Sequence, residues 1–175
     1  MPAAASEWLL DANLLIALTQ AAHVHHAEAH HWMGLTPRRR WATCALTQLA
    51  FVRLTSNPRV VGSTISPAEA MQALGAMTAG PHHAYWDDAP APLQSATLGS
   101  AALVGHRQVT DAYLLDLAVG RSARLATLDR GLAAFAQALG LQRHVEWVGT
   151  TASVQEPGPT YRAAPTRKRP GAARA

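Results

Sequence analysis

Short apolar runs alternate with longer segments of helical character along most of this chain. The runs have the length and composition of strands that are buried in a sheet. Because helical segments separate successive runs, the pattern predicts an α/β fold with a mainly parallel central sheet. The predicted strands are Glu7–Leu10, Trp41–Ala45, Ala84–Trp86, Arg124–Leu128 and Val145–Val148.

Helix start and stop signals divide the segments between these runs. The sequence Ser66-Pro67-Ala68-Glu69 is a strong start, because Ser can cap, Pro suits the first helical position and Glu falls at the third. Thr47 and Thr110 are predicted to cap two other helices, and Gly140 to close the last one. The predicted helices are Asn13–Thr19, His23–Trp32, Thr47–Leu54, Pro67–Thr78, Thr110–Val119 and one from Asp129 or Arg130 to Leu139.

Charge divides the 175 residues into a body and a tail. The net charge is +4, and residues 151–175 carry all of it, since five basic side chains there face Glu156 alone. Four prolines and little apolar periodicity predict that this tail is a disordered basic extension, which could contact phosphates or simply aid solubility. Residues 1–150 are formally neutral and have the length of one domain.

Composition excludes several classes of protein. Hydrophobic residues make up 49% of the chain, as in ordinary globular folds, and the single cysteine, Cys44, rules out an internal disulfide framework or a Cys-rich zinc module. The apolar run Trp8–Leu18 is interrupted by Asp11 and Asn13 and has no basic segment before it, unlike a signal peptide. No apolar stretch reaches the roughly 20 residues of a membrane-spanning helix. We therefore expect a cytoplasmic protein without membrane association.

Three aspartates occupy the chemically distinctive positions. Asp11 and Asp129 each follow an apolar strand, and Asp111 lies in the first turn of a helix. Ligand sites of open parallel sheets form at the carboxyl ends of strands, where these side chains could meet. A hard cation such as Mg²⁺ would offset their repulsion, polarise a phosphate oxygen and activate a water. The pattern indicates metal-dependent phosphodiester hydrolysis, although strand-end and capping roles would explain the same residues.

The segments around these acids carry a family resemblance. They read Leu9-Leu10-Asp11-Ala12-Asn13-Leu14-Leu15-Ile16, Val109-Thr110-Asp111-Ala112-Tyr113-Leu114-Leu115 and Leu125-Ala126-Thr127-Leu128-Asp129, and Ala42–Arg53 and Ser56-Asn57-Pro58 lie between the first and second. In this order and at these separations, they resemble the motifs of PIN-domain ribonucleases, in particular the VapC toxins of VapBC toxin–antitoxin modules. The resemblance covers about residues 6–148.

The resemblance implies a fold, an activity and partners. The fold would be a PIN-like three-layer α/β/α sandwich with a mainly parallel central sheet. The activity would be that of an endoribonuclease dependent on Mg²⁺ or Mn²⁺, which Asp11, Asp111 and Asp129 would hold. The RNA substrate would be structured, often tRNA or rRNA. The partners would be a VapB-like antitoxin, whose C-terminal segment blocks the groove, and a second copy in a homodimer.

Gln48 departs from the family pattern, which has a glutamate early in the helix after the second strand. An amide is neutral and offers one acceptor oxygen where a carboxylate offers two, so weaker metal binding is the first expectation. Gln48 could still bind the ion through its carbonyl or orient a water. The chain could be an active natural variant, which we favour, a degenerate copy or an engineered inactive form. A silent PIN fold that binds RNA or antitoxin is therefore the alternative function.

Two polar residues beside the acids are further candidates. Thr127 lies two residues before Asp129, on the same side of the strand, and could hydrogen-bond a ligand carboxylate or a phosphate. Ordinary β-propensity would also explain a threonine there. Asn13 could orient Asp11 or cap the following helix. Asn13 also stands where haloacid-dehalogenase-like phosphatases need a second aspartate, which counts against that third alternative; a DNA nuclease is the other phosphohydrolase alternative.

The other acidic residues are expected to lie outside the site. Asp116 follows Asp111 by five residues and so points about 140° away around the helix, which predicts an exposed side chain. Asp87 and Asp88 fall in a predicted loop and could supply the missing glutamate charge, but we favour solvated side chains.

Two clusters of other polar residues have an alternative structural explanation. His26 and His30 are four residues apart and could share a zinc ion, but the HExxH pattern is absent and an exposed polar face is favoured. Arg38-Arg39-Arg40 could steer RNA or form a solvated turn.

Overall fold

The computed structural model describes residues 7–35, 38–61, 65–87 and 90–149. The predicted tail, residues 151–175, and Asp88 lie outside these ranges. None of the helices within them has the length and apolar character that crossing a bilayer requires.

A five-stranded sheet forms the centre of the fold, with the strand order β3-β2-β1-β4-β5 and every pair parallel. This arrangement confirms the predicted α/β class. The register pairs Leu9 with Ala42 on one side and Leu10 with Ala126 on the other, so the chain segments that follow β1 and β4 emerge side by side. The strands are β1 (Glu7–Leu10), β2 (Arg40–Cys44), β3 (His83–Trp86), β4 (Arg124–Thr127) and β5 (Val145–Trp147).

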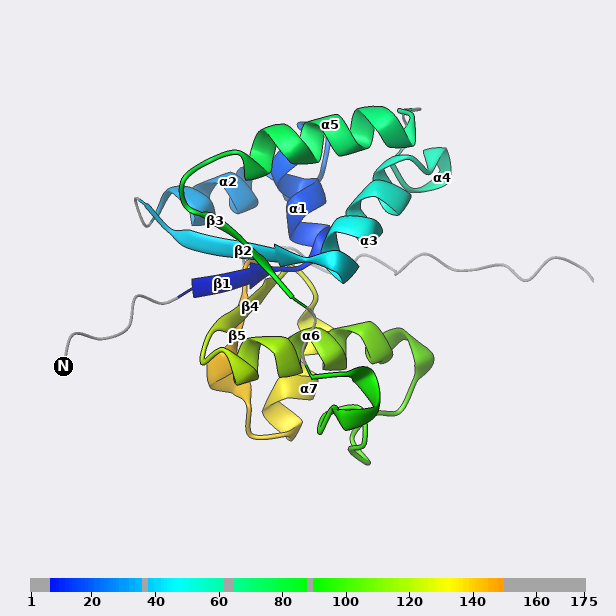
Figure 1. Ribbon diagram of the computed structural model, residues 1–175, viewed down its shortest axis with the longest axis vertical. Helices are drawn as coiled ribbons and strands as arrows, with labels where there is room; N and C mark the ends of the chain where they lie inside the picture. The colour runs from blue at the N-terminus through cyan, green and yellow to red at the C-terminus, as the bar shows by residue number, and fades with distance from the viewer. Residues whose placement is uncertain (1–6, 36–37, 62–64, 88–89, 150–175) are drawn as a thin grey trace, which may run out of the picture.

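Helices cover both faces of the sheet and give the three layers that were predicted (Figure 1). One face carries α1 (Ala12–Thr19), α2 (His26–Gly34), α3 (Ala45–Thr55), α4 (Pro58–Val61) and α5 (Pro67–Thr78). The other carries α6 (Val109–Gly120) and α7 (Arg130–Ala138). Three short 3₁₀ turns are Pro92–Gln94, His106–Gln108 and Gln142–His144.

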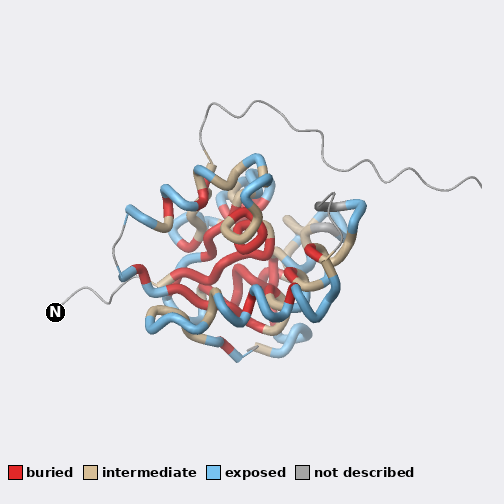
Figure 2. The backbone as a smooth tube through the Cα atoms, turned by 90° about the horizontal axis from the view of Figure 1, so that it is seen from above, coloured by how far each residue is buried: buried red, intermediate tan, exposed pale blue. Residues whose placement is uncertain are grey.

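Strand alternation divides the apolar core in two. Leu9, Ala42 and Leu125 face α6 and α7, whereas Leu10 and Ala126 face the layer of α1 to α5. All five are fully buried, and Figure 2 shows the buried chain at the centre of the molecule with exposed segments around it. Burial on both faces is the reason why these strands read as continuous apolar runs rather than as alternating ones.

Most predicted boundaries hold to within a few residues, and two predicted caps are wrong. Ser66 caps α5 as expected, with its hydroxyl accepting from the Glu69 amide at 3.2 Å. Thr47 is not an N-cap, because α3 begins directly after β2 at Ala45, and its buried hydroxyl instead accepts from the Cys44 amide at 3.0 Å. Thr110 is already inside α6, because the turn His106–Gln108 leads straight into that helix.

Asp116 is buried, which corrects the prediction that it is exposed. Its carboxylate accepts hydrogen bonds from the Ser95 hydroxyl and from the Thr97 amide, the latter at 3.2 Å. The Thr97 hydroxyl in turn donates to the Ala112 carbonyl at 2.6 Å. The segment around Ser95 and Thr97 therefore covers the side of α6 that a helical wheel leaves open to solvent.

Arg39 is also buried, so it neither steers RNA nor belongs to a solvated turn. Its guanidinium lies 4.2 Å from the ring centroid of Trp8 and 4.0 Å from that of Trp32. Both indole N–H groups donate to the Glu146 carboxylate at 2.6 Å. Burial alone would raise the pKa of Glu146, but these bonds and the nearby arginines lower it overall. Arg38 and Arg40, by contrast, are exposed.

Candidate active site

The carboxylate of Asp11 lies buried where β1 passes into α1. Its Oδ1 accepts from the Ala12 amide at 2.6 Å, and its Oδ2 accepts from the Thr127 hydroxyl at 2.8 Å. Burial raises the pKa of Asp11, these hydrogen bonds oppose the rise, and the charge of Asp129 adds to it. Asp11 is thus the N-cap of α1 and, at the same time, a buried carboxyl group at the candidate site. A capping role therefore does not exclude a chemical one.

Thr127 joins the ends of the two central strands. Besides donating to Asp11, its hydroxyl accepts from the Asp129 amide at 3.0 Å and from Nδ2 of Asn13 at 3.4 Å. Asn13 in turn accepts from the Leu128 amide at 3.3 Å through Oδ1. Thr127 is fully buried, so this set of bonds holds Asp11 and the start of the Asp129 loop in fixed relation.

Asp129 caps α7 at the exposed side of this network. Its Oδ1 accepts from the Gly131 amide at 2.6 Å, a contact that the positive end of a helix dipole favours. The two aspartates therefore differ in solvent exposure: Asp11 is buried and Asp129 is exposed.

Asp111 completes the acidic group from the first turn of α6. Its pKa is raised to about 7, by burial first and then by the charges of Asp11 and Asp129. The charges of Asp11 and Asp129 contribute to this shift because the fold places them near the carboxyl group of Asp111. The fold therefore brings together the three aspartates that are far apart in the sequence, on the α6 and α7 side of the sheet.

The donor set fits a hard divalent cation. Carboxylate oxygens are the ligands that Mg²⁺ and Mn²⁺ prefer, and a cation would offset the charges of Asp11 and Asp129, which add to burial in raising the pKa of Asp111. Within the described ranges, no three His, Cys, Asp or Glu side chains already converge as a preformed metal site. Mg²⁺ does not require such convergence, because it commonly keeps several waters and uses one or two carboxylates.

Gln48 lies in the first turn of α3, directly after β2, and so at the same edge of the sheet. Its Nε2 donates to the Thr43 hydroxyl at 2.9 Å. Strand alternation places Thr43 on the same side as Trp41, facing the layer of α1 to α5, whereas Thr127 faces α6 and α7. Thus the hydrogen bond of Gln48 holds its amide nitrogen away from the aspartates.

The histidine pair is used by the fold. The rings of His26 and His30 lie 4.3 Å apart between centroids, and each binds a backbone carbonyl at the end of α1. His26 Nδ1 is 2.8 Å from the Ala17 oxygen, and His30 Nε2 is 2.9 Å from the Leu18 oxygen. These contacts satisfy carbonyl groups that the helix end leaves free. Asp87 is exposed in its loop, as favoured from the sequence.

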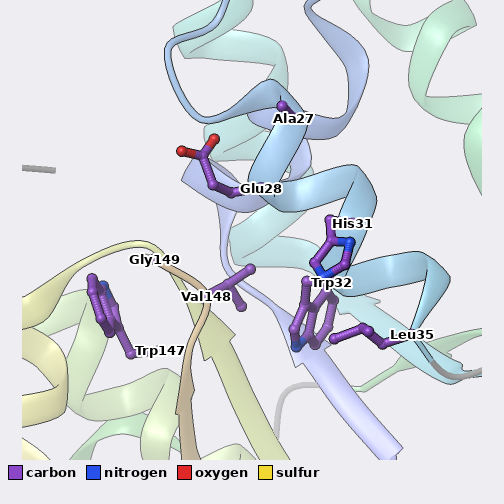
Figure 3. A pocket seen from close by; sticks show the side chains of 8 residues that line it. All are labelled: Ala27, Glu28, His31, Trp32, Leu35, Trp147, Val148 and Gly149. Carbon is purple, nitrogen blue, oxygen red and sulfur yellow. The ribbon is translucent and has the colours of Figure 1, made fainter. Parts of the chain in front are cut away.

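A separate apolar pocket of about 440 Å³ lies between α2 and the end of β5 (Figure 3). This pocket was not predicted from the sequence. Neither was the contact of 2.8 Å between Oγ1 of Thr43 and Nε2 of His83, next to Gln48. That contact could have been suspected, because Thr43 and His83 are polar residues of otherwise apolar strands. The pocket is lined by Ala27, Glu28, His31, Trp32, Leu35, Trp147, Val148 and Gly149.

Comparison with known proteins shows that the chain is similar to several ribonucleases from Mycobacterium tuberculosis. Ribonuclease VapC38 is 43% identical over 130 residues, which are 74% of this chain and 89% of the relative. Ribonuclease VapC29 is 46% identical over 125 residues, 71% of this chain and 87% of the relative. No family model matches the chain.

Among solved structures, the chain resembles the crystal structure of PAE2754 from Pyrobaculum aerophilum. The TM-score is 0.51 at 23% identity, over 75% of this chain and 80% of that one. At this identity the likeness concerns the fold alone.

Proposed function

This chain belongs to the VapC family of PIN-domain ribonucleases, and we propose that it is the toxin of a toxin–antitoxin pair, an endoribonuclease that hydrolyses RNA phosphodiester bonds with Mg²⁺ or Mn²⁺. Asp11, Asp111 and Asp129 hold the cation. The substrate is a structured RNA, either tRNA or rRNA. The names of its relatives favour an enzyme over a silent binding module.

One observation carries the proposal. The pKa of Asp111 is raised to about 7 by burial and by the charges of Asp11 and Asp129. A protein that only needed helix caps would gain nothing from placing a third carboxylate against two others. Such mutual repulsion is common at functional sites, where a ligand or the reaction compensates for it. A divalent cation provides that compensation, and its charge in turn attracts the anionic phosphodiester.

The chain's own residues divide the work. The bound cation supplies charge that polarises a phosphate oxygen and stabilises the transition state. Asp11 is held by Thr127 and Ala12, so its oxygens keep one orientation. Asp129 lies at the exposed side, where RNA has access. Without a cation, burial and the two neighbouring charges favour the protonated form of Asp111, whereas cation binding favours the charged form of its carboxyl group.

The partners follow from the family. We propose a VapB-like antitoxin whose C-terminal segment covers the acidic groove, and a homodimer as the assembled form. The described body has no large excess of positive charge, so RNA binding at the acids depends on the cation.

Cleavage of cellular RNA tests the proposed function. The purified full chain is incubated with total RNA and with tRNA in Mg²⁺ or Mn²⁺, and new 5′ ends are mapped. We expect discrete fragments that EDTA abolishes. The absence of fragments with either cation from a folded protein, or fragments that persist in EDTA, would refute the proposal.

A further inference from the structure

The amide of Gln48 is the end of a chain of hydrogen bonds that reaches into the sheet. Its Nε2 donates at 2.9 Å to Oγ1 of Thr43, a fully buried residue of β2. The same Oγ1 lies 2.8 Å from Nε2 of His83 on the neighbouring strand β3. The hydroxyl of Thr43 therefore has one partner on each side, and its single proton can serve only one of them.

The ring of His83 decides which partner receives that proton. Burial lowers the pKa of His83 below the usual value for histidine, although the backbone of Thr78 opposes the shift, so the neutral ring is favoured. A neutral imidazole has one nitrogen without a proton, which can accept a hydrogen bond. Because Gln48 already donates to Thr43, the Thr43 proton is free for Nε2 of His83, which then accepts it.

Trp41 holds the ring of His83 in place. The two residues are directly opposed in the β2–β3 register, and their ring centroids are 4.6 Å apart. Trp41 is itself buried, with 8% of its surface exposed. His83, the last acceptor in this series of hydrogen bonds, is therefore part of the packed sheet rather than of a surface loop.

This direction of hydrogen bonding suits an amide at position 48 and not a carboxylate. A glutamate would offer only acceptor oxygens to the Thr43 lone pairs. To bind it, Thr43 would have to turn its proton away from His83, and Nε2 of His83 would then need a proton of its own. Gln48 is thus matched by the buried Thr43 and, through it, by the half-buried His83.

We propose that Thr43 and His83 are positioning residues for the Gln48 amide: Thr43 holds its nitrogen, and this leaves its carbonyl oxygen as a neutral ligand for the cation. The proposal rests on the proposed function in taking that edge to bind a cation. Gln48 follows β2, which neighbours β1, so it is placed at the same edge as Asp11. An amide oxygen adds a ligand there without adding a fourth negative charge.

The protonation of the His83 ring tests the hydrogen bonds from Gln48 through Thr43 to His83, and this test needs neither a metal nor an activity assay. In the ¹⁵N-labelled full chain in EDTA, long-range proton–nitrogen correlations report which ring nitrogen carries a proton. We expect an unprotonated Nε2 in the wild type and a protonated Nε2 in Gln48→Glu. A His83 ring with the same protonation in both proteins would overturn the proposed direction of these hydrogen bonds.

Mn²⁺ binding, measured by titration calorimetry, tests whether Thr43 positions Gln48 as a ligand for the cation. We expect Thr43→Val to weaken Mn²⁺ binding about tenfold, the lower end for residues that orient a metal ligand. Thr43→Ser, which keeps the hydroxyl, should retain the wild-type affinity. In a Gln48→Ala background, Thr43→Val should have little further effect, because the group that it positions is gone.

The outcomes separate this inference from the proposed function. An equal loss of Mn²⁺ affinity on Thr43→Val in the wild type and in Gln48→Ala would show a general structural effect and refute the positioning role. A folded wild type that binds no Mn²⁺ would refute the proposed cation site, and the positioning role with it.

Discussion

The hydroxyl of Thr127 donates a 2.8 Å hydrogen bond to the carboxylate of Asp11 across the ends of β4 and β1. Both residues are buried, and 116 positions of sequence separate them. The bond exists because β1 and β4 are neighbours in the sheet, with Leu10 opposite Ala126. It ties the conformation of the innermost acid to the strand that leads to Asp129.

Thr127→Val should loosen this arrangement. Valine keeps the shape and β-propensity of threonine but leaves Oδ2 of Asp11 without its donor and the Asp129 amide without its acceptor. We expect a loss of about 1–3 kcal/mol in the free energy of unfolding, measured by urea denaturation, together with slower RNA cleavage. Thr127→Ser should restore most of both; a Thr127→Val protein with wild-type stability and rate would contradict this role.

Asp111→Asn should make the metal-free protein more stable at alkaline pH. The folded-state pKa of Asp111, about 7, lies above its ordinary value of 3.8. The folded protein therefore holds this proton more tightly than the unfolded chain, and stability from this group is lost as pH rises from about 4 through about 7. Asparagine carries no charge at any of these pH values, so the variant does not lose this stability as the pH rises.

Urea midpoints in EDTA at pH 5 and pH 8 check this prediction. We expect the wild type to lose more stability than Asp111→Asn between the two values. Mn²⁺ should restore the wild type at pH 8 and have a smaller effect on the variant, because ligands stabilise the state that they bind. An identical pH dependence in both proteins would show that Asp111 is not repelled by its neighbours.

Gln48→Glu should not behave as the repair of a lost acid. The fourth carboxylate would add repulsion to a group in which Asp111 already has a raised pKa, and it would meet the lone pairs of Thr43. We expect the rate of RNA cleavage at pH 7 in Mn²⁺ to stay level or to fall. A large gain in rate would mean instead that Gln48 is a degenerate position.

Asp116→Ala should destabilise the fold through the segment that covers α6. The Ser95 hydroxyl and the Thr97 amide, both in buried residues, would lose their acceptor. We expect a loss of about 1–3 kcal/mol in thermal or urea unfolding, the cost of leaving buried donors without a partner. Asp87→Ala, at an exposed aspartate, is the matched control and should leave stability unchanged.

The positions of the three aspartates could be predicted because they depend on local patterns. Asp11 and Asp129 each follow an apolar run, and the parallel order of the strands brings such ends to one edge. The contact between Thr127 and Asp11 depends on which strands are neighbours and in what register, and neither is written in any short segment.

The wrong predictions have a similar cause. The helical wheel correctly turns Asp116 away from Asp111, but it gives no information on the segment at Ser95 and Thr97 that packs there. Arg39 was grouped with Arg38 and Arg40 by composition. Its burial between Trp8 and Trp32 depends on a strand and a helix that flank the turn in space.

The initial rate of RNA cleavage by Asp111→Asn tests the central claim most directly. Wild type, Asp111→Asn and the exposed control Asp87→Asn are compared on one mapped RNA in Mn²⁺, after circular dichroism has shown that all three are folded. The account predicts a rate at least ~100-fold lower for Asp111→Asn, as for the loss of a group that acts on the transition state, and a wild-type rate for Asp87→Asn. Cleavage by folded Asp111→Asn at the wild-type rate would contradict the account.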